Sequence, residues 1–288
     1  MHMNKSLGIS IGCLALVAVV SVRTVCFASP TITVGRNVAA GQRVAVGQID
    51  HSGWDALLKK YVDERGNVDY TTWKATAADT KMLDDYILQL SAASFPANAS
   101  QGEKLAFWIN AYNAVTVKGI LREYPTTSIR NHTAKIIGYN IWKDLQLLVG
   151  GKAYSLEGIE HEVLRKMGEP RIHFAIVCAS IGCPRLLNEA YVAEKMDDQL
   201  TLNAQAFFAD PTKFSADPRS GTIQVSPILS WFASDFGDDT AAQLKTIAPY
   251  VPTEAQGLAK SGRTRVSYLE YDWALNDQSK TGQSGKQK

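Results

Sequence analysis

Two cysteines carry the strongest chemical signal in this sequence. Cys178 and Cys183 lie in the segment RIHFAIVCASIGCP, residues 171–184. The apolar residues of its first half predict a buried strand, and Pro184 is of a type favoured at the first position of a helix. Cys183 would then lie at a helix N-terminus, where free N–H groups and the helix dipole stabilise a thiolate. The segment therefore predicts a strand that delivers a reactive thiol to a helix.

Two histidines precede the cysteines and are candidate partners. A cysteine hydrolase needs a histidine within hydrogen-bond reach of its thiol, and a third group that orients this histidine. His161 follows Glu157 by four positions on the helix predicted over residues 156–165, so the two side chains share a face. We expect His161 to act as the base and Glu157 to orient its ring; the alternative is a solvated charge cluster. His173 lies inside the expected strand, where a hydrogen-bonded structural role is expected.

The longest predicted helix spans residues 102–124 and ends before Pro125. It is apolar around most of its circumference, which is typical of a central, buried helix. Asn110 and Asn113 interrupt it on one side. Unsatisfied buried amides cost about 1–3 kcal/mol each, so these side chains need partners. Either they bind the backbone of a neighbouring loop and fix its shape, or they line a pocket and serve as the third catalytic group.

The two cysteines also allow chemistry other than hydrolysis. The four residues between them permit a disulfide, either structural or redox-active. Thiol oxidoreductases favour a tighter two-residue spacing within a βαβ context, which is absent here. The cysteines and histidines match no usual zinc-ligand spacing, and the chain has no phosphate loop or dinucleotide-binding fingerprint. We therefore expect neither a metal nor a cofactor.

The first 28 residues are predicted to be a signal peptide. Lys5 precedes an apolar run too short for a comfortable membrane span, and Cys26-Phe-Ala28 fits a cleavage site. Cleavage removes Lys5 and Arg23, so the formal charge falls from +2 to 0 and nothing indicates a nucleic-acid partner. We expect a periplasmic or secreted protein without a stable membrane span. The cysteines at 178 and 183 would be its only ones, in an oxidising compartment.

Helices alternate with short strands that do not follow a βαβ order, which predicts an α+β fold. We expect one mostly helical domain over residues 51–276, with a small antiparallel or mixed sheet around a strand at 171–178. Residues 29–50 are interpreted as an N-terminal arm outside the core. Residues 277–288 are polar and rich in Gly, Gln, Ser and Lys, which predicts a disordered tail.

Several of these segments resemble motifs of the domain-of-unknown-function family 547 (DUF547). They are FWINAYN (107–113), SLEGIEH (155–161), RIHF (171–174), CASIGCP (178–184), WFASDF (231–236) and YDWALN (271–276). The likeness runs over most of the chain after the arm, with the motifs in order. It implies an exported bacterial member of the family. Because the family name records an unknown function, the resemblance supports a domain assignment and no mechanism.

The leading hypothesis is an exported cysteine hydrolase that acts on a peptide, amide or thioester bond. Cys183 or Cys178 would be the nucleophile and His161 the base. The alternatives are a non-enzymatic domain that binds a ligand or a protein in the same cleft, and a thiol-redox protein that uses both cysteines. A small molecule or a peptide is the expected ligand. The sequence does not indicate an oligomeric state.

Overall fold

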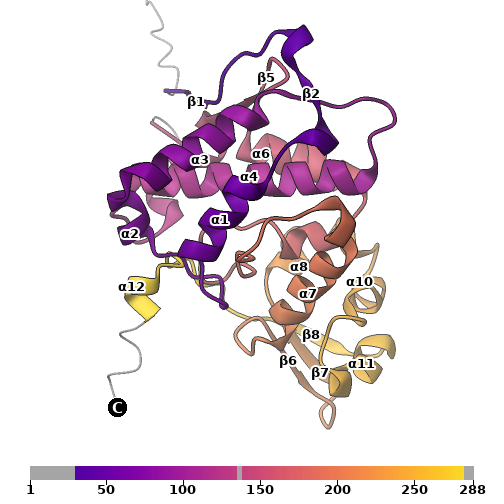
Figure 1. The fold of residues 1–288 in the computed structure, drawn as a ribbon. Coiled ribbons are helices and arrows are strands. Elements are labelled where there is room, and N and C mark those ends of the chain that lie inside the picture. Colours follow the sequence, from indigo (N-terminus) through magenta and orange to yellow (C-terminus); the bar gives the residue numbers. More distant parts are fainter. Residues whose placement is uncertain (1–29, 135–137, 282–288) are drawn as a thin grey trace, which may run out of the picture.

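The structure is a computed structural model that describes residues 30–134 and 138–281. It is a single α+β domain rich in helix, with three small sheets, so the predicted fold class is confirmed. Figure 1 shows long helices in the upper part and a smaller group of helices and strands below them. The helices are α1 Ser52–Tyr61, α2 Tyr70–Ala75, α3 Ala77–Leu90, α4 Gln101–Glu123, α5 Ile141–Asp144, α6 Leu156–Gly158, α7 Met196–Ala209, α8 Ile228–Trp231, α9 Ala233–Phe236, α10 Thr240–Ile247, α11 Thr253–Lys260 and α12 Gln278–Thr281.

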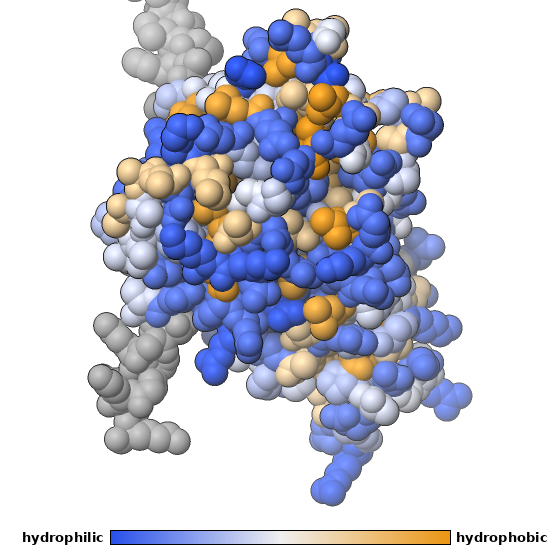
Figure 2. Space-filling model, in the orientation of Figure 1, coloured by the Kyte–Doolittle hydropathy of each residue, from blue (hydrophilic) through white to orange (hydrophobic). Residues whose placement is uncertain are grey.

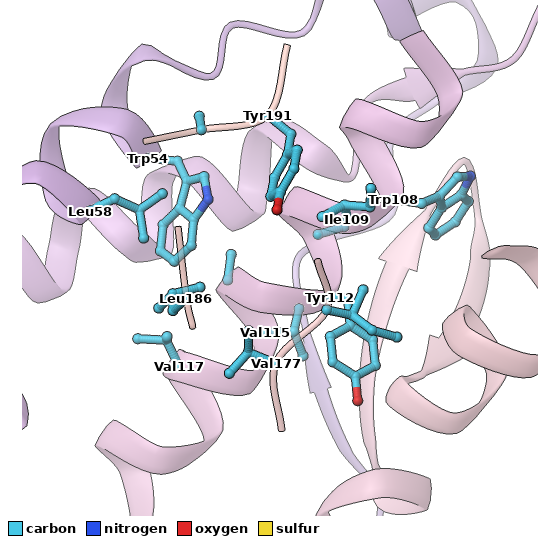
Figure 3. Packing of buried hydrophobic residues seen from close by; sticks show 14 of the residues in the cluster. Trp54, Leu58, Trp108, Ile109, Tyr112, Val115, Val117, Val177, Leu186 and Tyr191 are labelled. Atoms are coloured by element: carbon cyan, nitrogen blue, oxygen red, sulfur yellow. The ribbon is translucent and has the colours of Figure 1, made fainter. Parts of the chain in front are cut away.

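Helix α4 is the central element, as its apolar sequence predicts. Ser100 begins it with a reciprocal cap: its hydroxyl accepts from the N–H of Glu103 at 3.1 Å, and the Glu103 carboxylate accepts from the N–H of Ser100 at 2.6 Å. Figure 3 shows apolar side chains of α4 facing Trp54 of α1 and residues of the 177–191 region. The face of the molecule in Figure 2 is mainly hydrophilic. The apolar side chains of α4 are instead buried in the core, and removing them from water stabilises the packing.

Three small sheets surround the helices. The strands are β1 Ile32–Val34, β2 Val44–Ala45, β3 Ala93–Ser94, β4 Leu145–Val149, β5 Lys152–Ser155, β6 Phe214–Asp217, β7 Thr222–Val225 and β8 Arg265–Tyr268. They form the orders β1-β4-β5, β2-β3 and β6-β7-β8. The hairpin of β4 and β5 turns at Gly150 and Gly151, both with positive φ, which glycine adopts at no steric cost.

The N-terminal arm belongs to the fold, contrary to the prediction. β1 pairs with β4, and β2 pairs with β3. Val46 is 2% exposed and, with Ile49, joins the main hydrophobic core. The sequence lacks a clear period here because the arm makes short strands and turns rather than one long element. The predicted signal peptide, residues 1–28, lies outside the described residues.

The lower part of Figure 1 has its own hydrophobic cluster. It is built by α7, the sheet β6-β7-β8 and the helices α8 to α11. Phe174 packs between Phe207 and Phe208 in this cluster, at ring-centroid distances of 4.9 and 5.0 Å. The neighbouring Ile172 and Ile176 belong to the main core. The segment that precedes the cysteines therefore runs between the two clusters.

The predicted strand at 171–178 is wrong. Residues Pro170–Phe174 form a 3₁₀ turn, and the chain then continues without a strand to the cysteines. Its backbone groups bond to side chains instead of to a neighbouring strand: the Asn203 amide donates to the carbonyl of Phe174 at 3.0 Å. A short apolar run indicates burial, but periodicity alone does not distinguish a strand from other buried backbone.

The predicted helix after Pro184 is also wrong. Residues 184–192 have no helix, and the next turn begins at Ala193. The expected position of Cys183 at a helix N-terminus is therefore overturned. Cys183 lies in a loop instead.

The predicted tail is ordered at its start. Asp277 is 2% exposed and accepts a hydrogen bond from Tyr124 at 2.8 Å, and α12 follows it. The prediction of disorder from residue 277 is therefore wrong for residues 277–281, and residues 282–288 lie outside the described part. No helix within residues 30–134 and 138–281 combines the length and apolarity that a membrane crossing requires.

Candidate functional site

The cysteines lie in a tight loop held by the C-terminal segment 271–277, here called the strap. The N–H groups of Ile181 and Gly182 donate to strap carbonyls at 2.8 Å each. Gly182 packs so closely that a Cβ atom there would lie 3.0 Å from backbone atoms of Asp272. Ala179 has a φ of 59°, a conformation that costs free energy for a residue with a Cβ. The strap therefore fixes a strained loop that presents two sulfurs.

Cys183 is surrounded by hydrogen-bond donors. Its Sγ lies 2.6 Å from Sγ of Cys178, and both cysteines are free thiols. It also accepts from the N–H of Cys178 at 3.1 Å, from the Tyr271 hydroxyl at 3.1 Å and from the Ser180 hydroxyl at 3.4 Å. Burial by itself would raise the pKa of Cys183, but these donors outweigh burial and lower it to about 6. These donors thus favour the thiolate form of Cys183.

The pKa of Cys178 shifts in the opposite direction. Its close contact with the Cys183 sulfur, together with burial, raises the pKa of Cys178 well above its usual range. The two thiols therefore titrate as a pair, and the donors around Cys183 favour loss of the first proton from that sulfur. Cys178 is partly exposed, whereas Cys183 is 4% exposed. The sulfur that receives these donors consequently belongs to the more buried residue of the two.

Asn110 and Asn113 hold backbone, the first of the two roles considered for them. Asn113 donates to the carbonyl of Ala175 at 3.0 Å and accepts from the N–H of Val177 at 2.9 Å. Asn110 makes the same pair of bonds with the backbone of Tyr191, at 2.8 and 3.0 Å. α4 thereby fixes the chain on both sides of the cysteine loop, and neither amide lines the cavity described below.

His161 and His173 meet a partly buried ionic network that the sequence did not reveal. Asp235 of α9 accepts two bonds from Arg165, at 2.6 and 2.7 Å, and one from His173 Nε2 at 2.7 Å. Burial alone would raise the pKa of Asp235, but Arg165 and His173 lower it to about 2. Burial lowers the pKa of His173 to about 4, so its ring is neutral at pH 7. The expected hydrogen-bonded role of His173 is confirmed, on a 3₁₀ turn instead of a strand.

The helix that carries His161 contains a π segment, Ile159–Leu164. Ser155 caps its start, accepting from the N–H of Gly158 at 3.0 Å. Glu160, which the sequence reasoning missed, lies in this segment and is partly exposed, and with Tyr112 it lines the cavity described below. Burial and the nearby charge of Cys183 raise the pKa of Glu160 to about 7. In the sequence, Glu160 could have been noticed only from its place among the apolar positions of an expected helix.

One cavity of about 250 Å³ brings most of these groups together. It lies where the two hydrophobic clusters meet, because its walls include members of both. Its lining residues are Tyr112, Trp142, Lys143, Glu157, Glu160, His161, His173, Ile176, Cys178, Cys183, Pro184, Ile228, Trp231, Phe232, Tyr271 and Trp273. The cavity therefore joins the thiols, both histidines and two glutamates.

Within the cavity the predicted cysteine–histidine pair is not formed. In the described ranges, no hydrogen bond links His161 to either sulfur; its Nδ1 pairs with Arg165 at 3.0 Å. Glu157 does not hold the ring of His161 but lies 3.8 Å from Lys143, with both side chains about half exposed or more. Across residues 30–134 and 138–281, no three His, Cys, Asp or Glu side chains are placed to hold a metal ion.

Comparison with known proteins identifies one family. Residues 96–208 match the model of DUF547, a protein family of unknown function. This range contains α4, the helix that carries His161 and the cysteine loop, so the family match confirms the resemblance seen in the motifs between residues 107 and 184. No curated protein and no solved structure matches the chain significantly.

Proposed function

We propose that this protein catalyses thiol–disulfide exchange with Cys178 and Cys183 as its redox pair. The observation that carries the proposal is the 2.6 Å contact between the two sulfurs, one of which receives three further donors. Exchange needs a thiolate, a second thiol within reach and a low pKa for the leaving thiol. All three conditions are met without a histidine on either sulfur.

The exposure of the sulfurs gives the order of events. In the oxidised protein, a substrate thiolate attacks Sγ of Cys178, the more exposed residue of the pair. The Cys178–Cys183 bond breaks, and its electron pair leaves with Cys183 as a thiolate. A second substrate thiolate then attacks the substrate sulfur of the mixed disulfide, and Cys178 leaves and is protonated. The substrate dithiol is oxidised to a disulfide, the protein disulfide is reduced, and the remaining proton goes to Glu160 or to solvent.

The donors on Cys183 set the direction of this chemistry. They stabilise the thiolate, which exists only in the reduced protein, so they lower the free energy of the reduced form. A disulfide whose reduced form is stabilised is an oxidant towards other thiols. We therefore propose a thiol-oxidising role, in keeping with the export that the N-terminal segment predicts.

A redox titration tests the proposal. Purified protein lacking residues 1–28 is equilibrated in buffers of defined thiol and disulfide content, and the oxidised fraction is measured by mass after the free thiols are alkylated. We expect a reversible two-electron transition that Cys178→Ser and Cys183→Ser each abolish. A pair that stays reduced, or that oxidises and cannot be reduced by substrate thiols, would contradict the proposal.

A cysteine hydrolase is the second candidate, favoured by Glu160. A carboxyl group with a pKa of about 7 beside a thiolate with a pKa of about 6 can donate a proton to a leaving group. Hydrolysis needs one sulfur and exchange needs both. A Cys178→Ser variant that still forms an acyl adduct on Cys183 with a peptide thioester, and releases it, would favour the hydrolase. Loss of both activities in this variant would favour exchange.

A further inference from the structure

The wall of the cavity next to the sulfurs is a set of four aromatic rings, here called the aromatic mouth: Trp142, Trp231, Tyr271 and Trp273. Tyr271 and Trp273 lie 4.6 Å apart between ring centroids, and Trp231 lies 4.8 Å from Tyr271 and 5.8 Å from Trp273. Trp142 contacts Trp273 at 6.2 Å. The rings come from α5, α8 and the strap, three parts of the chain that are distant in sequence.

This mouth is both open and adjacent to the reactive atoms. Trp231 is 49% exposed, an uncommon state for a tryptophan. The hydroxyl of Tyr271 lies 3.4 Å from Sγ of Cys178 and 3.1 Å from Sγ of Cys183. A group stacked on the mouth is therefore within one residue of the sulfur that the exchange mechanism exposes to substrate.

The size and charge of the cavity restrict what binds there. At about 250 Å³ it is smaller than the roughly 300–1,000 Å³ of pockets that hold drug-sized ligands, so it takes a single side chain rather than a large cofactor. Lys143 is matched by Glu157 at 3.8 Å, and the Cys183 sulfur, which accepts three hydrogen bonds, adds negative character. A small anionic disulfide gains no attraction from such a lining.

We infer that the substrate is a polypeptide whose reacting cysteine is followed by an aromatic residue, which stacks in the aromatic mouth. This inference rests on the proposed exchange function and deepens it. Aromatic pairs prefer offset or edge-to-face contacts at 4.5–7 Å, and the mouth offers such faces next to Cys178. The neighbouring aromatic residue would thereby hold the substrate sulfur in line with the protein sulfur.

The inference is tested with activated peptides of sequence Gly-Cys-X-Gly, blocked at both ends, in which the cysteine carries a coloured aromatic thiol as a mixed disulfide. X is Phe, Leu, Ala or Asp. Release of the coloured thiol by the reduced protein is followed by absorbance. We expect the Phe peptide to react at least about threefold faster than the Ala peptide, and the Asp peptide to react most slowly. Trp231→Ala should remove the preference for Phe.

Tyr268→Ala is the matched control, because Tyr268 is also an exposed aromatic residue, 51% exposed on β8. It should keep the preference. Equal rates for all four peptides, or faster reaction with an anionic tripeptide disulfide than with the Phe peptide, would overturn the inference while leaving thiol exchange intact. Absence of release from every peptide would overturn the exchange function, and the inference with it.

Discussion

Arg165 donates from its guanidinium to Nδ1 of His161 at 3.0 Å. A guanidinium group has no acceptor, so Nδ1 must be the accepting, unprotonated nitrogen of the ring. The neutral His161 ring therefore carries its proton on Nε2. The same arginine is fixed by its two bonds to Asp235. His161 consequently offers the cavity a hydrogen-bond donor, which differs from the base that its sequence position suggested.

This tautomer predicts that His161 does not activate the thiols. His161→Ala and His161→Gln should change the rate of iodoacetamide labelling of Cys183 at pH 7 by less than about twofold, because the donors on this sulfur come from other residues. A general base would contribute roughly 10²-fold or more. A loss of tenfold or more in both variants would restore the cysteine–histidine pair. The labelled cysteine is identified by peptide mass.

Tyr271→Phe should raise the pKa of Cys183 by removing one of its donors. A hydrogen bond to a charged group is worth about 1.5–3 kcal/mol, which corresponds to about one to two pKa units. Labelling at pH 6 should slow by about fivefold or more, and the difference should vanish above pH 9, where the thiol is ionised in both proteins. Tyr268→Phe, on the exposed face of β8, is the control. An unchanged pH profile would show that the hydroxyl does not stabilise the thiolate.

The sequence predicted those features that depend on local chemistry. The apolar run of α4 required a central helix, and the cost of burying amides required partners for Asn110 and Asn113, which they find on loop backbone. The Gly150-Gly151 turn and the Ser155 cap are likewise formed by local residues. Each of these outcomes is decided within a few residues of the chain or by a strong desolvation penalty.

The features that the sequence did not predict depend on tertiary placement. Tyr271 and Asp235 reach the site from segments distant from the cysteines, and no spacing rule joins them to it. Glu160 is turned inward by a π segment, which a 3.6-residue period does not describe. Proline is common at helix starts but is equally compatible with a loop. Pro184 therefore led to the wrong prediction that Cys183 lies at a helix N-terminus.

Glu160→Gln should alter how stability depends on pH. The folded-state pKa of Glu160 is raised from 4.5 to about 7, so between these values the folded protein binds the additional proton and its stability falls as pH rises. A glutamine resembles the protonated carboxyl at every pH. The variant should match the wild type near pH 4.5 and exceed its unfolding free energy by about 1–3 kcal/mol at pH 8.

Urea unfolding from pH 4.5 to 8 measures this difference. His51 and His173 have lowered pKa values and favour the folded state as pH rises through the same range, but their contributions are common to both proteins and cancel. Glu157→Gln, on the same helix and about half exposed, is the matched control and should run parallel to the wild type. Parallel curves for Glu160→Gln as well would mean that its carboxyl is not protonated in the folded protein.

Asn113 and Asn110 each make two hydrogen bonds to backbone, but the backbone that Asn113 holds lies closer along the chain to the thiols. Comparing the two therefore distinguishes an effect on stability from an effect on the geometry of the thiol pair. Asn113→Ala and Asn110→Ala each remove two buried hydrogen bonds and should lower the unfolding free energy by about 2–4 kcal/mol. Only Asn113 holds the backbone that runs directly into Cys178. Its loss should therefore also change the labelling rate of the cysteines, whereas Asn110→Ala should leave that rate near the wild-type value.

Asn113→Asp keeps the test informative if the alanine variant does not fold. The aspartate retains the acceptor for the N–H of Val177 and loses the donor to the carbonyl of Ala175. Asn113→Asp should therefore change the labelling rate of the cysteines in the same direction as Asn113→Ala. Two asparagines on the same helix with the same bonds should affect labelling equally if both are merely structural. Equal effects of the two alanine variants would therefore mean that the hydrogen bonds of Asn113 to residues 175–177 do not position the thiol pair.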